Sequence, residues 1–189
     1  LLYRGGKTSE FGYLCLLPVE SAEAFVGECY EKSQKYEGGL CGVDIHNVLR
    51  LEGRFFNIFA EGLSVKDPLS LGLQWMIDLD KEEFRGSAAI FERREQGYTR
   101  KIVGVRIDGK NDALQPEASL FDGEENVGVV LTTCYSPVLD AMVGLALLPK
   151  EIAYSGIEFS VGAQGGLKVQ TISMPPIMPK SLTVKLDEM

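Results

Sequence analysis

The chain has 189 residues, 45% of them hydrophobic, which is typical of a globular protein with one large or two small domains. Nineteen Lys and Arg residues against 27 Asp and Glu residues give a net charge of -8, which argues against nucleic acid as a partner, because a phosphate backbone needs a positive surface. No apolar run approaches the ~20 residues of a membrane span. We therefore expect neither a nucleic-acid-binding nor a membrane protein.

The four cysteines, Cys15, Cys29, Cys41 and Cys134, lie far apart and form no C-x-x-C pair. With a single His in the chain, they give no basis for a zinc site, so no metal ligands are predicted. We expect reduced, mostly buried thiols in the cytoplasm or another reducing compartment, with two disulfides as the alternative. No signal peptide is predicted, and because the chain begins inside a predicted turn we expect a fragment.

The first elements in chain order are a strand and two helices. Residues 13–17 form a continuous apolar run, which predicts a strand buried on both faces. Apolar residues at helical spacing after an N-cap at Ser21 predict an amphipathic helix packed on that strand. A shorter helix capped by Asp44 follows, and Gly53 is expected to end it in a left-handed conformation.

A strand at 73–79 and a helix at 87–94 complete this part of the chain, and Gly97 marks its end. Beyond Gly97 the pattern changes to short β-rich runs separated by Gly and Asp, which is typical of hairpins in a barrel or sandwich. These runs cover 101–107, 118–121, 127–133, 142–148, 157–161 and 167–172. The fold class predicted is α+β, a mixed α/β unit at 1–97 followed by an all-β domain at 98–189.

Three motifs follow one another in the middle of the chain. They are Leu-Arg-Leu-Glu at 49–52, Pro-Leu-x-x-Gly-Leu-x-Trp at 68–75 and Asp-Lys-x-x-Phe-x-Gly at 80–86. In this order they resemble the C-terminal half of the glycine cleavage T-protein (aminomethyltransferase) superfamily. At the front, Arg-x-Gly-x-Thr-x-Glu-x-Gly at 4–12 resembles the family's Arg-Thr-Gly-Tyr-Thr-Gly-Glu-Asp-Gly segment, and 127–137 resembles a later Val-Gly-x-Val segment that closes in Ser-Pro.

The resemblance implies a three-domain ring of two mixed α/β units followed by a β-barrel. It also implies tetrahydrofolate as the cofactor, held in the central hole of that ring. It implies a partial folate-binding unit at 1–97 and a C-terminal β-barrel domain at 98–189. The family's founding reaction passes an aminomethyl group from a lipoyl arm to tetrahydrofolate, so a lipoyl-carrier protein and the chain's own N-terminal half are candidate partners. The family's catalytic Asp lies in that N-terminal half and no residue here matches it, so no catalytic residue is predicted.

Glu10 matches the family Glu that holds the pterin edge of the folate. One ionised carboxylate can accept two hydrogen bonds from neighbouring N–H groups, a bidentate and charge-assisted arrangement. The alternative is an ordinary solvated Glu in a glycine-rich turn.

His46 stands where active aminomethyltransferases usually have Arg, and Asn47 where they have Asp. A neutral imidazole cannot replace a charged guanidinium, so this departure weighs against the glycine cleavage reaction. The sarcosine and dimethylglycine dehydrogenase branch also lacks that Arg, so folate binding is compatible with it. His46 is thus a candidate folate contact. As the single His of the chain it could also act as a general base, but we favour a packed or capping role over that one.

Phe55 falls where the family has an aromatic residue lining the folate site, usually Tyr. Stacking on a pterin would survive this change, and a hydroxyl hydrogen bond would not. The alternative that we favour is core packing with Phe56 and Phe59. Trp75 and Phe84 are predicted core residues.

The leading hypothesis is a tetrahydrofolate-dependent aminomethyl or one-carbon transferase. The alternative is a non-catalytic folate-binding or regulatory member of the superfamily, suggested by His46 and Asn47. A demethylase, or the folate end of an amine-oxidising enzyme, would share the cofactor and differ in the donor. The iron–sulfur-assembly branch is excluded, because its Lys-Gly-Cys-Tyr motif is replaced by Lys-Glu-Glu-Phe at 81–84.

Overall fold

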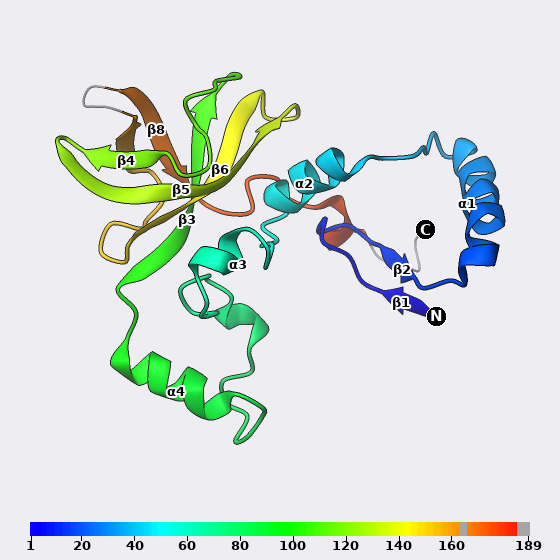
Figure 1. The fold of residues 1–189 in the computed structure, drawn as a ribbon, viewed down its shortest axis with the longest axis horizontal. Coiled ribbons are helices and arrows are strands. Elements are labelled where there is room, and N and C mark those ends of the chain that lie inside the picture. The colour runs from blue at the N-terminus through cyan, green and yellow to red at the C-terminus, as the bar shows by residue number, and fades with distance from the viewer. Residues whose placement is uncertain (163–165, 185–189) are drawn as a thin grey trace. The chain divides into compact units, whose positions relative to one another are not determined.

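The computed structural model describes residues 1–162 and 166–184, which form two compact units (Figure 1). The first unit comprises Leu1–Phe55 and the C-terminal residues from Ile177. The second unit comprises Phe56–Pro176. No helix in the described part of the chain is long and apolar enough to cross a membrane.

A two-stranded antiparallel sheet opens the first unit. Strand β1 (Leu2–Arg4) pairs with β2 (Tyr13–Cys15), with Tyr3 opposite Leu14. The predicted strand is therefore present at 13–15, but its expected burial is wrong, since Leu14 is 57% exposed. All six residues of the two strands are exposed, so among the described residues no element covers either face of this sheet.

The helices of the first unit begin and end differently from the prediction. Helix α1 (Val19–Gln34) begins directly after Pro18, not at Ser21, and it contains no buried residue, so its predicted packing on the strand is wrong. Helix α2 (Val43–Glu52) takes Gly42 as its N-cap, which leaves Asp44 in its first turn.

The end of α2 corrects the prediction for Gly53. Gly53 has a φ of -85°, and Arg54 is the left-handed residue, with a φ of 63°. The chain then turns back so that the N–H of Phe55 donates to the Arg50 carbonyl at 2.7 Å. A short 3-10 helix, η2 (Lys180–Leu182), lies in the C-terminal part of the same unit.

The second unit contains a closed antiparallel barrel, which confirms the predicted α+β fold class and decides between barrel and sandwich (Figure 1). The strands close in the order β3-β6-β5-β4-β7-β8. Their bounds agree with the predicted runs to within three residues: β3 (Arg100–Asp108), β4 (Ser119–Asp122), β5 (Glu125–Ser136), β6 (Ala141–Pro149), β7 (Glu158–Val161) and β8 (Leu167–Ile172).

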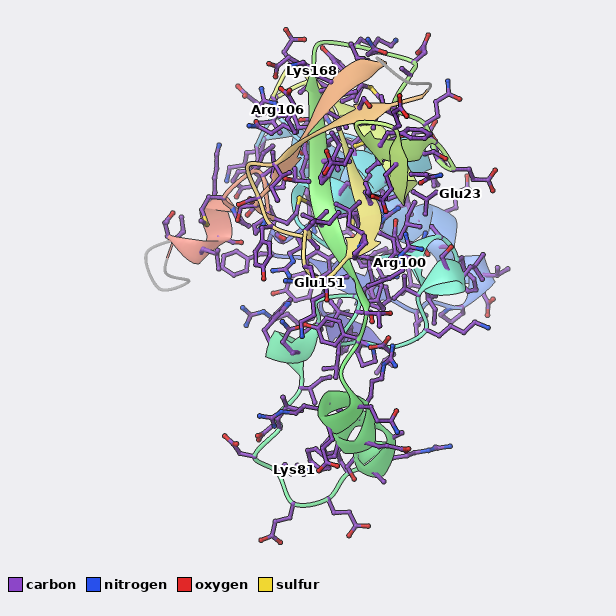
Figure 2. The ribbon with its side chains drawn as sticks, turned by 90° about the vertical axis from the view of Figure 1, so that its left-hand side faces the viewer. Glu23, Lys81, Arg100, Arg106, Glu151 and Lys168 are labelled. Atoms are coloured by element: carbon purple, nitrogen blue, oxygen red, sulfur yellow. The ribbon has the colours of Figure 1, made fainter. Side chains whose placement is uncertain are left out.

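Alternation of side chains explains why this sequence closes a barrel. Val105 on β3, Leu120 on β4 and Leu148 on β6 are completely buried and belong to one apolar cluster. Successive strand residues point to opposite faces, so the charged residues between them face outward. Arg106 on β3 and Lys168 on β8 are examples (Figure 2), the former paired with Asp108 at 2.7 Å.

Short helices precede the barrel in the second unit, and the described residues place them at α3 (Glu61–Ser64), η1 (Gln74–Met76) and α4 (Ser87–Gln96). The predicted helix at 87–94 is confirmed by α4. The predicted strand at 73–79 is wrong, because Gly72 turns the chain with a φ of 70° and η1 follows. This segment meets β3 as a loop, in which the Ser70 carbonyl accepts the N–H of Ile102 at 2.9 Å.

Two side chains in this part test the predicted core. Trp75 is 62% exposed, so its assignment to the core is wrong. Phe84 is half-buried and packs edge-to-face on Phe91 at 6.2 Å between ring centroids. Gly97, with a φ of 78°, ends α4, and the domain division at this residue stays a prediction.

All four cysteines are free, so the alternative of two disulfides is not realised. Cys15, Cys29 and Cys41 are exposed and Cys134 is half-buried. The expected burial is therefore wrong for the first three. Cys15 lies on β2 and Cys29 on α1, neither of which has a buried residue, and Cys41 lies just before α2.

Candidate functional site

The turn between β1 and β2 carries the sequence motif that includes Glu10. Pairing of the two strands holds its ends together, and the N–H of Gly5 donates to the Gly12 carbonyl at 3.0 Å. The Arg4 guanidinium lies 5.6 Å from the centroid of the Phe11 ring, at cation–π distance. Ser9 adopts a left-handed φ of 63°. These contacts give the turn a defined shape that presents Ser9 and Glu10.

Ser9 ties this turn to the end of α2. Its hydroxyl donates to the Gly53 carbonyl at 2.7 Å. A Cβ on Gly53 would overlap the Ser9 hydroxyl oxygen, so this position requires glycine for the close approach of the two segments. Glycine is therefore needed at 53 so that Ser9 can approach closely, and not for the left-handed conformation that the sequence suggested.

The Glu10 carboxylate is a bidentate acceptor of two neighbouring backbone N–H groups. Oε1 accepts the N–H of Lys180 and Oε2 accepts the N–H of Ser181, both at 2.9 Å. The Ser181 hydroxyl donates in turn to the Ser9 carbonyl at 2.8 Å. The geometry is the one expected for a carboxylate that binds paired N–H donors, although the donors here belong to the chain itself.

The same contacts set the protonation of Glu10. Its slight burial acts to raise the pKa, but the hydrogen bonds from Ser181 and Lys180 favour the charged form more strongly, and the pKa lies below its ordinary value. Glu10 is therefore an ionised acceptor at neutral pH.

His46 lies near the start of α2, and its side chain is exposed. Of the packed and capping roles that we favoured, the packed one is therefore wrong and the capping one stays a prediction. His46 precedes Gly53 by seven residues, a separation of about 10 Å along a helix axis. The Ser9–Gly53 contact thus brings the Glu10 turn to the opposite end of α2 from His46. The role of His46 as a folate contact stays a prediction.

Phe55 follows the end of α2 that the Glu10 turn meets. Its ring is half-buried, and its carbonyl accepts a hydrogen bond from Arg50 Nη1 at 3.1 Å. Phe59 is 82% exposed and Phe56 is half-buried, so neither of these two rings is a fully buried core residue. The role of Phe55 as an aromatic contact for a folate stays a prediction.

Arg50 and Asn47 are polar residues of α2 whose arrangement the sequence did not predict. Arg50 is only 3% exposed, and its Nε donates to Asn47 Oδ1 at 2.7 Å. The signal in the sequence was their i, i+3 spacing, which places both side chains on one helix face. Together they fix the last turns of α2.

Lys180 and Ser181 were missed for a physical reason: the 2.9 Å hydrogen bonds that they donate to Glu10 come from main-chain N–H groups, and a backbone donor leaves no residue signature. Within the described residues no three His, Cys, Asp or Glu side chains gather in an arrangement that could hold a metal ion. The candidate site is thus the Glu10 turn, the end of α2 and the start of η2, all within the first unit.

The comparisons with known proteins agree with the fold. Residues 100–177 match the family model of the glycine cleavage T-protein C-terminal barrel domain. An aminomethyltransferase of Synechococcus sp. (strain CC9902) is 29% identical over 175 residues, covering 92% of this chain and 46% of that protein. One from Thermotoga petrophila is 29% identical over 172 residues, covering 91% and 46%.

A solved structure gives the same picture. The glycine cleavage system aminomethyltransferase T from Bartonella henselae superposes with a TM-score of 0.74 at 24% identity, over 93% of this chain and 49% of that one. The chain spans about half the length of the relatives it matches. The α+β fold with its closed barrel is the fold of this solved structure. Residues 100–177 form the glycine cleavage T-protein C-terminal barrel domain, and nearly the whole chain is similar to about half of the aminomethyltransferases of that superfamily.

Proposed function

We propose that this chain supplies folate-binding residues to a tetrahydrofolate-dependent aminomethyl or one-carbon transferase. Similarity to aminomethyltransferases over nearly the whole chain supports the proposal. The observation that carries it is the Glu10 carboxylate, whose two oxygens each accept one of two adjacent N–H groups at 2.9 Å. The edge of a pterin presents neighbouring N–H donors of the same kind, so the chemistry of Glu10 fits this ligand.

The chain's own residues would bind and orient the folate. Glu10 would fix the pterin edge, Phe55 at the same end of α2 would contact its flat face, and His46 about two turns away would contact a more distant part of the ligand. Tetrahydrofolate, when bound, supplies the nitrogen atoms that accept the one-carbon unit. No residue of this chain matches the catalytic Asp of the family, so these residues are assigned to binding alone.

The proposed partners follow from the family. A lipoyl-carrier protein would deliver the aminomethyl group, and an N-terminal half of the T-protein type would supply the catalytic carboxylate. Four free thiols, three of them exposed, suit the reducing cytoplasm that we propose as the location.

The experiment that tests this function is a calorimetric titration of tetrahydrofolate into the protein with any natural sequence that precedes Leu1. Glu10→Gln removes the charge and one of the two acceptors, and the loss of a charge-assisted pair corresponds to about 10- to 100-fold weaker binding. Glu20→Gln, at an exposed position in the first turn of α1, is the matched control and should bind as the unaltered protein does. Equal affinities for all three proteins would remove Glu10 from the site.

One observation favours the alternative, a non-catalytic folate-binding or regulatory member. Asn47 stands where active relatives have Asp, and its Oδ1 accepts a hydrogen bond from Arg50, so it serves to order α2. Assays of transfer from aminomethyl and methyl donors separate the two functions. Saturable folate binding without turnover on any donor would support the alternative, and turnover would exclude it.

A further inference from the structure

The residues that meet Glu10 belong to a mostly exposed stretch at 180–184. Pro179 is buried, whereas Lys180 and Leu182 beyond it are exposed, Leu182 by 70%. We call residues 180–184 the C-terminal segment. It contacts the Glu10 turn through two backbone hydrogen bonds to the carboxylate and through the Ser181 hydroxyl, which donates to the Ser9 carbonyl. Beyond the buried Pro179, the contacts described between this segment and the Glu10 turn are therefore polar.

The two N–H groups are available to Glu10 because of their place in η2. The first N–H groups of a helix have no carbonyl partner inside it. Those of Lys180 and Ser181 stand side by side at the start of η2, and each donates to one oxygen of the carboxylate. The segment thus presents to Glu10 the same pair of donors as the edge of a pterin.

We propose that the C-terminal segment competes with the folate for Glu10 and must release the carboxylate before the pterin edge can bind. The proposal rests on the function proposed above. The two N–H groups take one lone-pair position on each oxygen of the carboxylate. A pterin edge that binds both oxygens side by side needs the same two positions, so the segment and the pterin cannot occupy them together. The segment acts as an internal strap, and the apparent folate affinity is reduced by the fraction of molecules in which it is closed.

Lys180→Pro opens the strap without touching Glu10. Proline has no N–H, so the hydrogen bond to Oε1 is lost. The backbone tolerates the change, because proline is favoured at the first position of a helix and the preceding Pro179 has a ψ of 137°, as a residue before proline requires. Lys180→Ala is the matched control, since it removes the side chain and its charge but keeps the N–H.

Competition predicts that Lys180→Pro binds tetrahydrofolate about tenfold more tightly in calorimetry, the factor that corresponds to one charge-assisted hydrogen bond. Lys180→Ala should bind as the unaltered protein does. Binding that is equal or weaker in Lys180→Pro overturns the strap and leaves the folate function standing. Absence of binding in all three proteins overturns the folate function and the competition with it.

Amide hydrogen exchange gives a second measurement, in which a competing strap and a merely structural contact predict opposite changes of the exchange rate. A bound ligand ordinarily slows exchange near its site, because it stabilises the folded state. A strap displaced by the ligand gives the opposite sign, so the amides of Lys180 and Ser181 should exchange faster when tetrahydrofolate is added. Slower exchange at both amides would mean that the segment and the folate bind together, and would overturn the proposal.

Discussion

The two units of this chain differ in what buries their apolar side chains. In the second unit Val105, Leu120 and Leu148 are completely buried inside a barrel that closes on itself. In the first unit α1 has no buried residue, and Leu14 and Val19 are 57% and 88% exposed. The barrel therefore supplies its own core, whereas in the first unit polar contacts such as Ser9 with Gly53 and Glu10 with η2 add to the burial of Leu51 on α2.

This difference indicates that most of the stability comes from the second unit, whereas the candidate site lies in the first. Hydrophobic burial is the dominant favourable contribution to folding, so the barrel should carry most of the free energy of unfolding. Glu10, His46 and Phe55 all belong to the first unit, in which a site formed by a few polar contacts can rearrange more readily. The predictions below test this contrast between the two units.

The largest effect is expected from truncating a leucine in the barrel. Leu148→Ala removes a side chain that is completely buried on β6, and such truncations lower the free energy of unfolding by about 2–5 kcal/mol. Leu14→Ala on β2, where the side chain is 57% exposed, should change it by less than about 0.5 kcal/mol. Urea denaturation of both variants measures the difference. Similar losses in the two would refute the contrast.

Alanine substitutions of two glycines should act in opposite directions. A Cβ on Gly128 in β5 would lie 2.7 Å from the Leu147 carbonyl oxygen, an overlap with backbone that should lower the free energy of unfolding by about 1–3 kcal/mol. Gly27 in α1 has no atom within 4 Å of such a Cβ. Gly27→Ala should therefore stabilise its helix by about 0.5–1 kcal/mol.

Thermal unfolding followed by circular dichroism measures both variants, since helix and strand signals differ. Gly128→Ala should lower the midpoint and Gly27→Ala should raise it slightly. A lower midpoint for Gly27→Ala would mean that α1 is covered by other parts of the protein in solution.

The smallest effect is a pH dependence confined to the first unit. The pKa of Glu10 is lower in the folded chain, so its contact with Lys180 and Ser181 is fully present above the ordinary carboxyl pKa and is lost as pH falls through the lowered value. The amide chemical shifts of both residues should follow one titration with a midpoint below 4.5, the ordinary value for Glu.

Glu10→Gln should abolish this titration, and the barrel amides should not follow it. A midpoint at or above 4.5 would show that the two hydrogen bonds do not favour the charged carboxylate in solution.

The barrel was predictable from sequence because its signals are local. Alternation along 101–107 and 142–148, with turn residues between the runs, is sufficient to place strands, and β3 and β6 lie within two residues of the prediction. The first unit was less predictable, because the apolar runs at 13–17 and in α1 were assumed to be buried. An apolar pattern identifies the face of a strand or helix that tends to be buried, but it does not identify the element that buries it.

The candidate site was predictable only in part. Glu10 was found through its motif, and its bidentate geometry was anticipated from the chemistry of a carboxylate. Its donors were not, since Lys180 lies 170 residues away and contributes only main-chain atoms. The strand expected at 73–79 failed for another reason: Gly72 and the turn that it allows outweigh the apolar residues that follow.

The most direct test of the account is a map of backbone amide shifts during a titration with tetrahydrofolate. We predict that the perturbed amides gather in the first unit, at the Glu10 turn, at the end of α2 and at Lys180 and Ser181, while the strands of the barrel change little. Perturbations centred on the barrel strands, with the Glu10 turn unchanged, would contradict the assignment of folate binding to the first unit.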